Sequence, residues 1–285
     1  MFSLLKLMRW KNLVLICLSQ IFMVLSIFSK DQFTFPVLIY IVCTFCFAAS
    51  GNIINDIFDI IPDKTNKPQK VLIPKIISFK KAHQTYYLLN SIGLILTIYG
   101  SYLLQNYTFT AYGIFVIALL HIYSSTLKGT PMLGNLVIAS FTSISLLFFL
   151  LIIPSSSDQN LTLLIYSLLA FLINWAREMI KDIEDIKGDK KANLKTTPIT
   201  MGTRTTVYII QGILLLTTTV LIVIMYLSVN TLLKCYIFIT LILPLCYIFN
   251  RLHKCFERQH FSKISKILKL IVVFGILSIA LIKIS

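Results

Sequence analysis

The sequence predicts an all-α membrane protein of about nine transmembrane helices, in which two four-helix repeats and a ninth helix surround a central cavity. Composition is the first reason, because 57% of the 285 residues are hydrophobic and only 13% are charged. The mean hydropathy is +0.84, and a soluble protein of this length could not bury so many apolar side chains in its core. The apolar residues also gather in runs of roughly 16 to 22, close to the roughly 20 that a helix needs to cross the hydrocarbon layer. The third reason is an acidic motif that occurs twice.

The apolar runs give the expected helices in chain order. The first run is long and no small-residue cleavage site follows it, so we expect it to remain in the protein and not to be removed as a signal peptide. We place the nine spans near residues 12–29, 35–54, 86–104, 107–122, 136–153, 161–178, 207–228, 231–249 and 267–283.

The basic residues predict how the spans are oriented. The chain has 26 Lys and Arg against 11 Asp and Glu, an excess that would suggest nucleic-acid binding in a soluble protein. All but Lys30, Lys234 and Lys283, however, lie at the N-terminus or follow even-numbered spans. The positive-inside rule therefore places the N-terminus and the even-numbered connections in the cytoplasm and the C-terminus outside. We expect a multi-pass protein of the cell (plasma) membrane that contacts membrane lipids and no nucleic acid.

Acidic residues are concentrated at the ends of the second and sixth spans. All but three of the 11 acids fall in GNIINDIFDIIPDKTNKPQK or in REMIKDIEDIKGDKKANLKTTPI, and both stretches contain D-x-x-D-x-x-x-D. In a helix, the three positions of this motif fall within about 60° of arc, so each triplet directs its carboxylates one way. Pro62 and Gly188 should loosen their helices and leave Asp63 and Asp189 on loops.

Crowded carboxylates at the edge of a membrane repel one another unless a cation compensates them. Mg²⁺ prefers oxygen ligands and typically joins one or two carboxylates to substrate phosphate oxygens. Glu184 falls on a different side of its helix, where we expect it to pair with Lys181 or Lys187. The alternative for either cluster alone is a solvated acidic loop neutralised by its own lysines. We predict a Mg²⁺-diphosphate site whose metal ligands are Asp56, Asp59, Asp63, Asp182, Asp185 and Asp189.

The two acidic clusters also predict an internal repeat. Each closes the second helix of a four-span unit and is followed by lysines and a proline. Membrane proteins built from repeats often place their sites at the repeat interface, so we expect both clusters to face one shared cavity. The predicted repeats cover about residues 1–128 and 129–255 of a single transmembrane domain, and the last helix covers 256–285.

Asn55-Asp56-x-x-Asp59-x-x-x-Asp63 and Asp182-x-x-Asp185-x-x-x-Asp189, in a chain of nine spans, resemble the paired motifs of the UbiA superfamily of intramembrane prenyltransferases. The resemblance covers nearly the whole chain. It includes Arg9 and Asn12, which match the family's R-P-x-N although Trp10 replaces the proline. It also includes HIYSSTLKGTPMLGNLVIA, which is similar to the family's Y-x-x-x-L-K stretch, with Tyr123 and Lys128 as the matching residues.

Within the superfamily, REMIKDIEDIKGD followed by KTTPI is most similar to the digeranylgeranylglyceryl phosphate synthases, or geranylgeranylglycerol-phosphate geranylgeranyltransferases. This resemblance implies Mg²⁺-dependent transfer of a geranylgeranyl group from its diphosphate to geranylgeranylglyceryl phosphate, a lipid-soluble acceptor, through an allylic cation. For this chemistry we expect Lys128, Tyr123 and Lys195 as catalytic residues, with the aromatic face of Tyr123 beside the cation. We expect the substrate to be bound by Arg9, Asn12, Asn55 and Lys128, and by Lys67, Lys70 and Lys195, which flank the acidic clusters.

Three alternatives stay open at this stage. The acceptor could be an aromatic quinone precursor or haem, which would leave the metal site unchanged. A divalent-cation transporter would also carry carboxylates in a membrane, but it would need polar residues along a through-path, whereas both clusters lie at one face. The third alternative is a non-catalytic lipid-binding protein.

Overall fold

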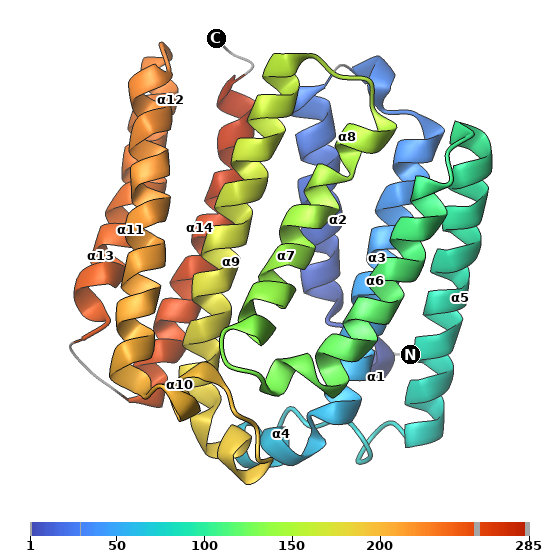
Figure 1. The fold of residues 1–285 in the computed structure, drawn as a ribbon, viewed down its shortest axis with the longest axis vertical. Coiled ribbons are helices and arrows are strands. Elements are labelled where there is room, and N and C mark those ends of the chain that lie inside the picture. The colour runs from blue at the N-terminus through green and yellow to red at the C-terminus, as the bar shows by residue number, and fades with distance from the viewer. Residues whose placement is uncertain (1, 29, 254–256, 283–285) are drawn as a thin grey trace. The chain divides into compact units, whose positions relative to one another are not determined.

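The structure is a computed structural model that describes residues 2–28, 30–253 and 257–282. Over these ranges the chain forms helices joined by short connections, with no β-strand (Figure 1). The chain divides into two compact units, each described here by itself. Unit 1 comprises Met1–Leu25, Ser29–Lys128 and Phe148–Pro154, and unit 2 comprises Ser26–Phe28, Gly129–Leu147 and Ser155–Ser285.

Unit 1 is built around one buried helix, α3, which packs against both α5 and α6. Small residues make the contact with α5 close, because Gly93 leaves room for the Phe47 ring where an added Cβ would overlap it. The unit contains α1 (Phe2–Leu7), most of α2 (Trp10–Ile27), a short 3-10 turn (Lys30–Gln32), α3 (Phe35–Phe58), α4 (Ile60–Asn66), α5 (Phe79–Leu104), α6 (Thr108–Ser125) and α8 (Phe149–Ile152). A second 3-10 turn, Leu127–Gly129, follows α6.

Unit 2 is organised around α9, a helix of 35 residues that packs against α7, α11 and α14. A π-helical segment, Phe238–Ile242, precedes Pro244, whose missing N–H removes one bond of the regular ladder. The helices of the unit are α7 (Leu133–Leu147), α9 (Ser157–Lys191), α10 (Thr197–Thr200), α11 (Thr203–Leu227), α12 (Thr231–Ile237), α13 (Leu243–Arg251) and α14 (Arg258–Ile282).

The predicted number of spans is confirmed. In the described part of the chain, nine helices are long and apolar enough to cross a membrane. They are Trp10–Ile27, Phe35–Phe58, Phe79–Leu104, Thr108–Ser125, Leu133–Ile152, Ser157–Lys191, Thr203–Leu227, Thr231–Arg251 and Arg258–Leu281. The boundaries at residues 255 and 256 between the second repeat and the last helix, the end of that helix at residue 285, and the position of Lys283 lie outside the described residues. The internal repeat and the shared cavity stay predictions.

The prediction that Asp63 and Asp189 lie on loops was wrong. Asp63 belongs to α4, whose third residue is Pro62, and the first turn of a helix tolerates proline because its N–H groups have no intrahelical acceptor. The helix breaks instead at Asp59, between α3 and α4. Asp189 lies in α9, which continues through Gly188, and its exposed fraction is only 6%. A single glycine costs a helix about 1 kcal/mol, too little to end it here.

Candidate functional site

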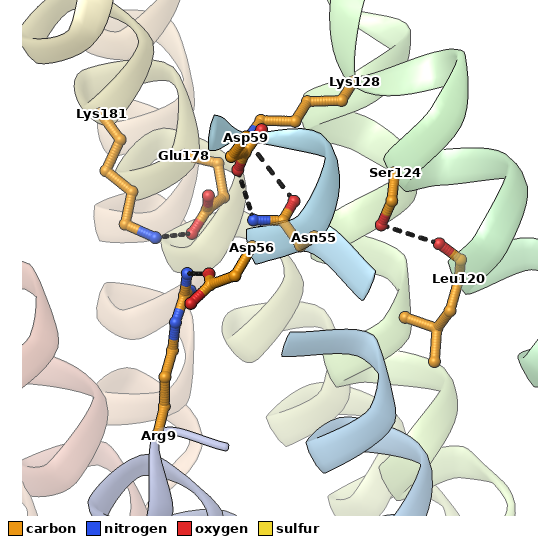
Figure 2. Close-up of polar contacts among 9 residues, drawn as sticks. All are labelled: Arg9, Asn55, Asp56, Asp59, Leu120, Ser124, Lys128, Glu178 and Lys181. Carbon is orange, nitrogen blue, oxygen red and sulfur yellow. Dashed lines mark hydrogen bonds and ion pairs between the residues drawn. The ribbon is translucent and has the colours of Figure 1, made fainter. Parts of the chain in front are cut away.

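Asp59 is the centre of the first acidic cluster, which belongs to unit 1. Its carboxylate pairs with the Lys128 ammonium and accepts a hydrogen bond from Asn55 Nδ2 at 2.5 Å. Lys128 Nζ also donates to Asn55 Oδ1 at 3.4 Å, so the three side chains form a closed triangle (Figure 2). Because Asp59 is only 5% exposed, its charge needs these partners. The structure therefore brings together three residues that the sequence assigned to metal or substrate binding.

Arg9 belongs to the same cluster through Asp56. Arg9 lies between α1 and α2 with φ of 57°, and its Nη2 is 2.6 Å from Asp56 Oδ1 (Figure 2). The two side chains are 40% and 20% exposed, and exposed ion pairs contribute at most about 1 kcal/mol to folding. The pair therefore matters chiefly because it places a guanidinium beside a candidate metal ligand.

Asp63 completes the cluster on α4. Burial raises the pKa of its carboxyl, and the neighbouring Asp59 adds to the increase, while Lys128 and Lys67 oppose it. Lys67 caps α4 and its backbone N–H donates to the carbonyl of Asp63 at 2.8 Å. Crowding of this kind favours a bound cation, as the sequence predicts.

The second acidic cluster lies along α9 in unit 2, and its carboxylates have partners on different helices. Asp182 Oδ2 accepts a hydrogen bond from Asn135 Nδ2 on α7 at 2.8 Å. Asp185 Oδ1 lies 3.8 Å from Arg258 Nη2 at the start of α14. Asp189, one turn beyond, is buried. Asn135 and Arg258 were not predicted as site residues.

Glu184 of α9 approaches a different basic residue from those predicted. Glu184 was expected to pair with Lys181 or Lys187, but its Oε1 approaches Arg258 at 4.0 Å. Lys181 pairs with Glu178 instead, one turn earlier on the helix at 2.7 Å, which supports the helix beyond its apolar part (Figure 2).

The structure describes the other predicted site residues at several places in the fold. Tyr123 is buried in α6 at 8% exposure, and Asn12 lies in α2, where its backbone N–H donates to Arg9. Lys70 is exposed after α4. Lys195 is also exposed, and its backbone N–H donates to the Gly129 carbonyl at 3.0 Å. Their roles stay predictions.

The carboxylate oxygens of the two clusters fit a hard divalent cation whose coordination shell is completed by a bound ligand. The candidate ligands are carboxylate oxygens, as Mg²⁺ prefers. Among the residues that the structure describes, no three His, Cys, Asp or Glu side chains form a group that could hold a metal ion. Mg²⁺ is typically held by one or two carboxylates, and phosphate oxygens and water complete its coordination shell.

The sequence of this chain matches a known protein family over most of its length. The UbiA prenyltransferase family matches residues 16–277, nearly the whole chain. This chain belongs to the UbiA prenyltransferase family. Its members include curated relatives named digeranylgeranylglyceryl phosphate synthase. The relative from Methanosphaera stadtmanae is 32% identical over 256 residues, or 87% of this chain and 88% of the relative.

Other UbiA relatives match over a shorter segment. The digeranylgeranylglyceryl phosphate synthase of Methanobrevibacter smithii is 34% identical over 172 residues, 59% of each chain. That of Methanosarcina mazei is 35% identical over 187 residues, 63% of this chain and 60% of the relative. This chain thus spans about three fifths of the length of these relatives.

Solved structures of the family share the fold. A structure reported for digeranylgeranylglyceryl phosphate synthase in membranes matches with a TM-score of 0.72 and 28% identity, over 98% of this chain and 96% of that one. A UbiA homolog from Archaeoglobus fulgidus bound to GPP and Mg²⁺ matches with a TM-score of 0.65 and 15% identity, over 98% and 99%. The described part of the chain, with its nine candidate membrane-spanning helices, therefore has the UbiA fold.

Proposed function

We propose that this UbiA family member transfers a geranylgeranyl group from its diphosphate to geranylgeranylglyceryl phosphate, with Mg²⁺ as cofactor. The observation that carries the proposal is the first acidic cluster, where Asp59, Asn55 and Lys128 meet with Asp56 and Arg9 beside them. Carboxylates beside lysine and arginine suit a metal-bound diphosphate, because the acids take the cation and the bases take phosphate oxygens. The names of the curated relatives support the acceptor.

The proposed metal ligands are the aspartates of both clusters. A bound Mg²⁺ supplies charge neutralisation of the diphosphate as the allylic C–O bond breaks. Lys128 and Arg9 are the side chains that donate to phosphate oxygens, with Lys67, Lys70 and Lys195 as further candidates. Asn55 fixes Asp59 through its amide. The diphosphate leaves with the electron pair of the broken C–O bond, the acceptor hydroxyl oxygen forms the new C–O bond to the prenyl carbon, and its proton passes to the released diphosphate or to water.

The protein is a multi-pass membrane protein, and we propose that it lies in the plasma membrane with the acidic clusters on the cytoplasmic side. The distribution of Lys and Arg supports this orientation. A prenyl diphosphate has a charged head and an apolar tail, so a site at one membrane face lets the tail stay in lipid.

An acceptor panel tests the proposal. Purified protein in detergent receives radiolabelled geranylgeranyl diphosphate and Mg²⁺ with geranylgeranylglyceryl phosphate, a naphthoate or a hydroxybenzoate in separate reactions. We expect labelled product from the glyceryl phosphate lipid alone. Equal product from an aromatic acceptor would overturn the acceptor assignment while leaving prenyl transfer intact, and no product from any acceptor would contradict the proposed function.

A further inference from the structure

Two buried polar residues of unit 2 connect the second acidic cluster to a neighbouring turn. Asn135, near the start of α7, is 5% exposed and donates from Nδ2 to Asp182 Oδ2 at 2.8 Å. Thr197, the first residue of α10, is fully buried and donates from its hydroxyl to Asn135 Oδ1 at 3.2 Å. Neither residue was a candidate on sequence grounds.

The direction of this hydrogen-bond chain is fixed from its start. The backbone N–H of Met132 donates to Thr197 Oγ1 at 2.8 Å. Because an N–H group can only donate, the threonine hydroxyl accepts there and directs its single proton to Asn135 Oδ1. The asparagine oxygen is therefore turned toward Thr197, which leaves the amide N–H₂ group for Asp182. This series of hydrogen bonds determines that the nitrogen of the Asn135 amide, not its oxygen, faces the Asp182 carboxylate.

Met132, the first donor in this series of hydrogen bonds, has an uncommon backbone conformation. Met132 has φ of 58°, in the left-handed region that non-glycine residues rarely occupy. Conformations of this kind cost about 1–3 kcal/mol and persist where surrounding contacts enforce them. At the other end, Pro198 lies at the beginning of α10 and sets φ directly after Thr197. The backbone is thus constrained both at Met132, which donates to the Thr197 hydroxyl, and directly after Thr197, whose hydroxyl supports Asn135.

Asn135 also differs in charge from the partners of the first cluster. Arg9 and Lys128 bring positive charge to Asp56 and Asp59, whereas the amide of Asn135 directs Asp182 without adding charge. A neutral donor orients a carboxylate and leaves its negative charge for a cation. We propose that Asn135 and Thr197 are positioning residues that hold Asp182 in the orientation in which it binds the divalent cation of the prenyl diphosphate complex. This inference rests on the proposed function.

Binding without turnover tests the inference. Radiolabelled geranylgeranyl diphosphate is bound to the full-length protein without acceptor over a range of Mg²⁺ concentrations, and the half-maximal Mg²⁺ concentration is measured. Loss of a residue that orients a metal ligand typically costs about 10- to 100-fold in metal affinity. We expect an increase of that size in Asn135→Leu and Thr197→Val, with maximal binding per folded protein restored by excess Mg²⁺. Thr197→Ser, which keeps the hydroxyl, should retain the wild-type midpoint.

Thr217→Val is the matched control. Thr217 is also fully buried in unit 2, and its hydroxyl donates to the Ile213 carbonyl of its own helix, so the same atoms are lost away from the cluster. We expect a wild-type midpoint. If Asp182→Asn raises the midpoint but folded Asn135→Leu and Thr197→Val leave it unchanged, the inference alone is wrong. If the wild-type protein shows no Mg²⁺-dependent binding, the proposed function fails and the inference fails with it.

Discussion

Lys128 contributes both to the stability of the first acidic cluster and to the proposed reaction. In the ligand-free cluster its ammonium compensates the buried Asp59 carboxylate, and removing one partner of a buried ion pair costs about 3–5 kcal/mol. When a prenyl diphosphate binds, the same ammonium is available to phosphate oxygens, where charge develops as the C–O bond breaks. The residue therefore contributes to stability and to the proposed reaction.

Lys128→Ala should lower both the turnover number and the thermal stability of the protein. We expect kcat per folded protein to decrease about 10²- to 10³-fold, as for the loss of other donors to a developing negative charge. The thermal midpoint should decrease as well, because Asp59 loses its counter-ion. Steady-state kinetics and a fluorescence melt in detergent measure the two effects, with exposed Lys80→Ala on α5 as control. Folded Lys128→Ala with wild-type kcat would remove the residue from the site.

Asp59→Ala and Asp185→Ala should each abolish prenyl transfer, because each removes a proposed metal ligand. Size-exclusion chromatography in detergent establishes that the variants are folded, and product formation from labelled prenyl diphosphate measures turnover. Asp31→Ala is the control, since Asp31 is an exposed acid in a separate 3-10 turn. Wild-type turnover in either site variant would show that its carboxylate is not needed.

The acidic spacing singled out Asp59, and the resemblance to the UbiA superfamily singled out Lys128, but neither predicted that these two side chains pair. Asn55, Asp59 and Lys128 were all candidates, and the structure joins them. Asn135 and Arg258 escaped prediction because their contacts with Asp182 and Asp185 come from helices far away in sequence. An asparagine at the start of an apolar span was the available signal for Asn135. Arg258 resembled any other basic residue of its segment.

At the scale of helices, hydropathy predicted the number of spans better than their ends. The predicted sixth span stops near residue 178, where charged residues begin, but α9 continues to Lys191. Charged residues at i and i+3, such as Glu178 and Lys181, support a helix outside the apolar layer. The helix α5 begins at Phe79, ahead of two lysines that hydropathy excluded, because the Ser78 hydroxyl caps its first turn by accepting from the Lys81 N–H. Both acidic motifs consequently lie on or beside helices.

Gly93 should be intolerant of a side chain. An added Cβ would overlap the Phe47 ring where α5 meets α3, and overpacking costs about 1–3 kcal/mol. Gly93→Ala should therefore lower the midpoint of a thermal melt in detergent. Gly212→Ala on α11 is the same change with nothing within 4 Å of the new Cβ, and it should be neutral or stabilising. Equal midpoints for the two variants would contradict the close packing of α3 against α5.

For the whole molecule, composition and the family match agree on a multi-pass UbiA protein. The repeated acidic motif predicted one shared site, which stays a prediction, because the two units are each defined by their own contacts. Sequence spacing alone could not place one unit against the other, since that depends on how helix faces pack.

The orientation in the membrane is open to a direct test. In a protein whose six native cysteines are replaced by alanine, Lys30→Cys and Lys75→Cys introduce single thiols into connections predicted to lie on opposite sides. A membrane-impermeant maleimide should label Lys30→Cys on intact cells and Lys75→Cys only after the cells are opened. The reverse pattern would invert the proposed topology.

Metal-dependent prenyl transfer is tested most directly by removing and restoring Mg²⁺. The quantity measured is product formation from radiolabelled geranylgeranyl diphosphate and geranylgeranylglyceryl phosphate. Acidic clusters that bind a metal-diphosphate predict prenylated lipid with Mg²⁺, none in EDTA, and recovery when Mg²⁺ is returned in excess. Undiminished product in EDTA would contradict the account, because the six aspartates would then have no metal to hold.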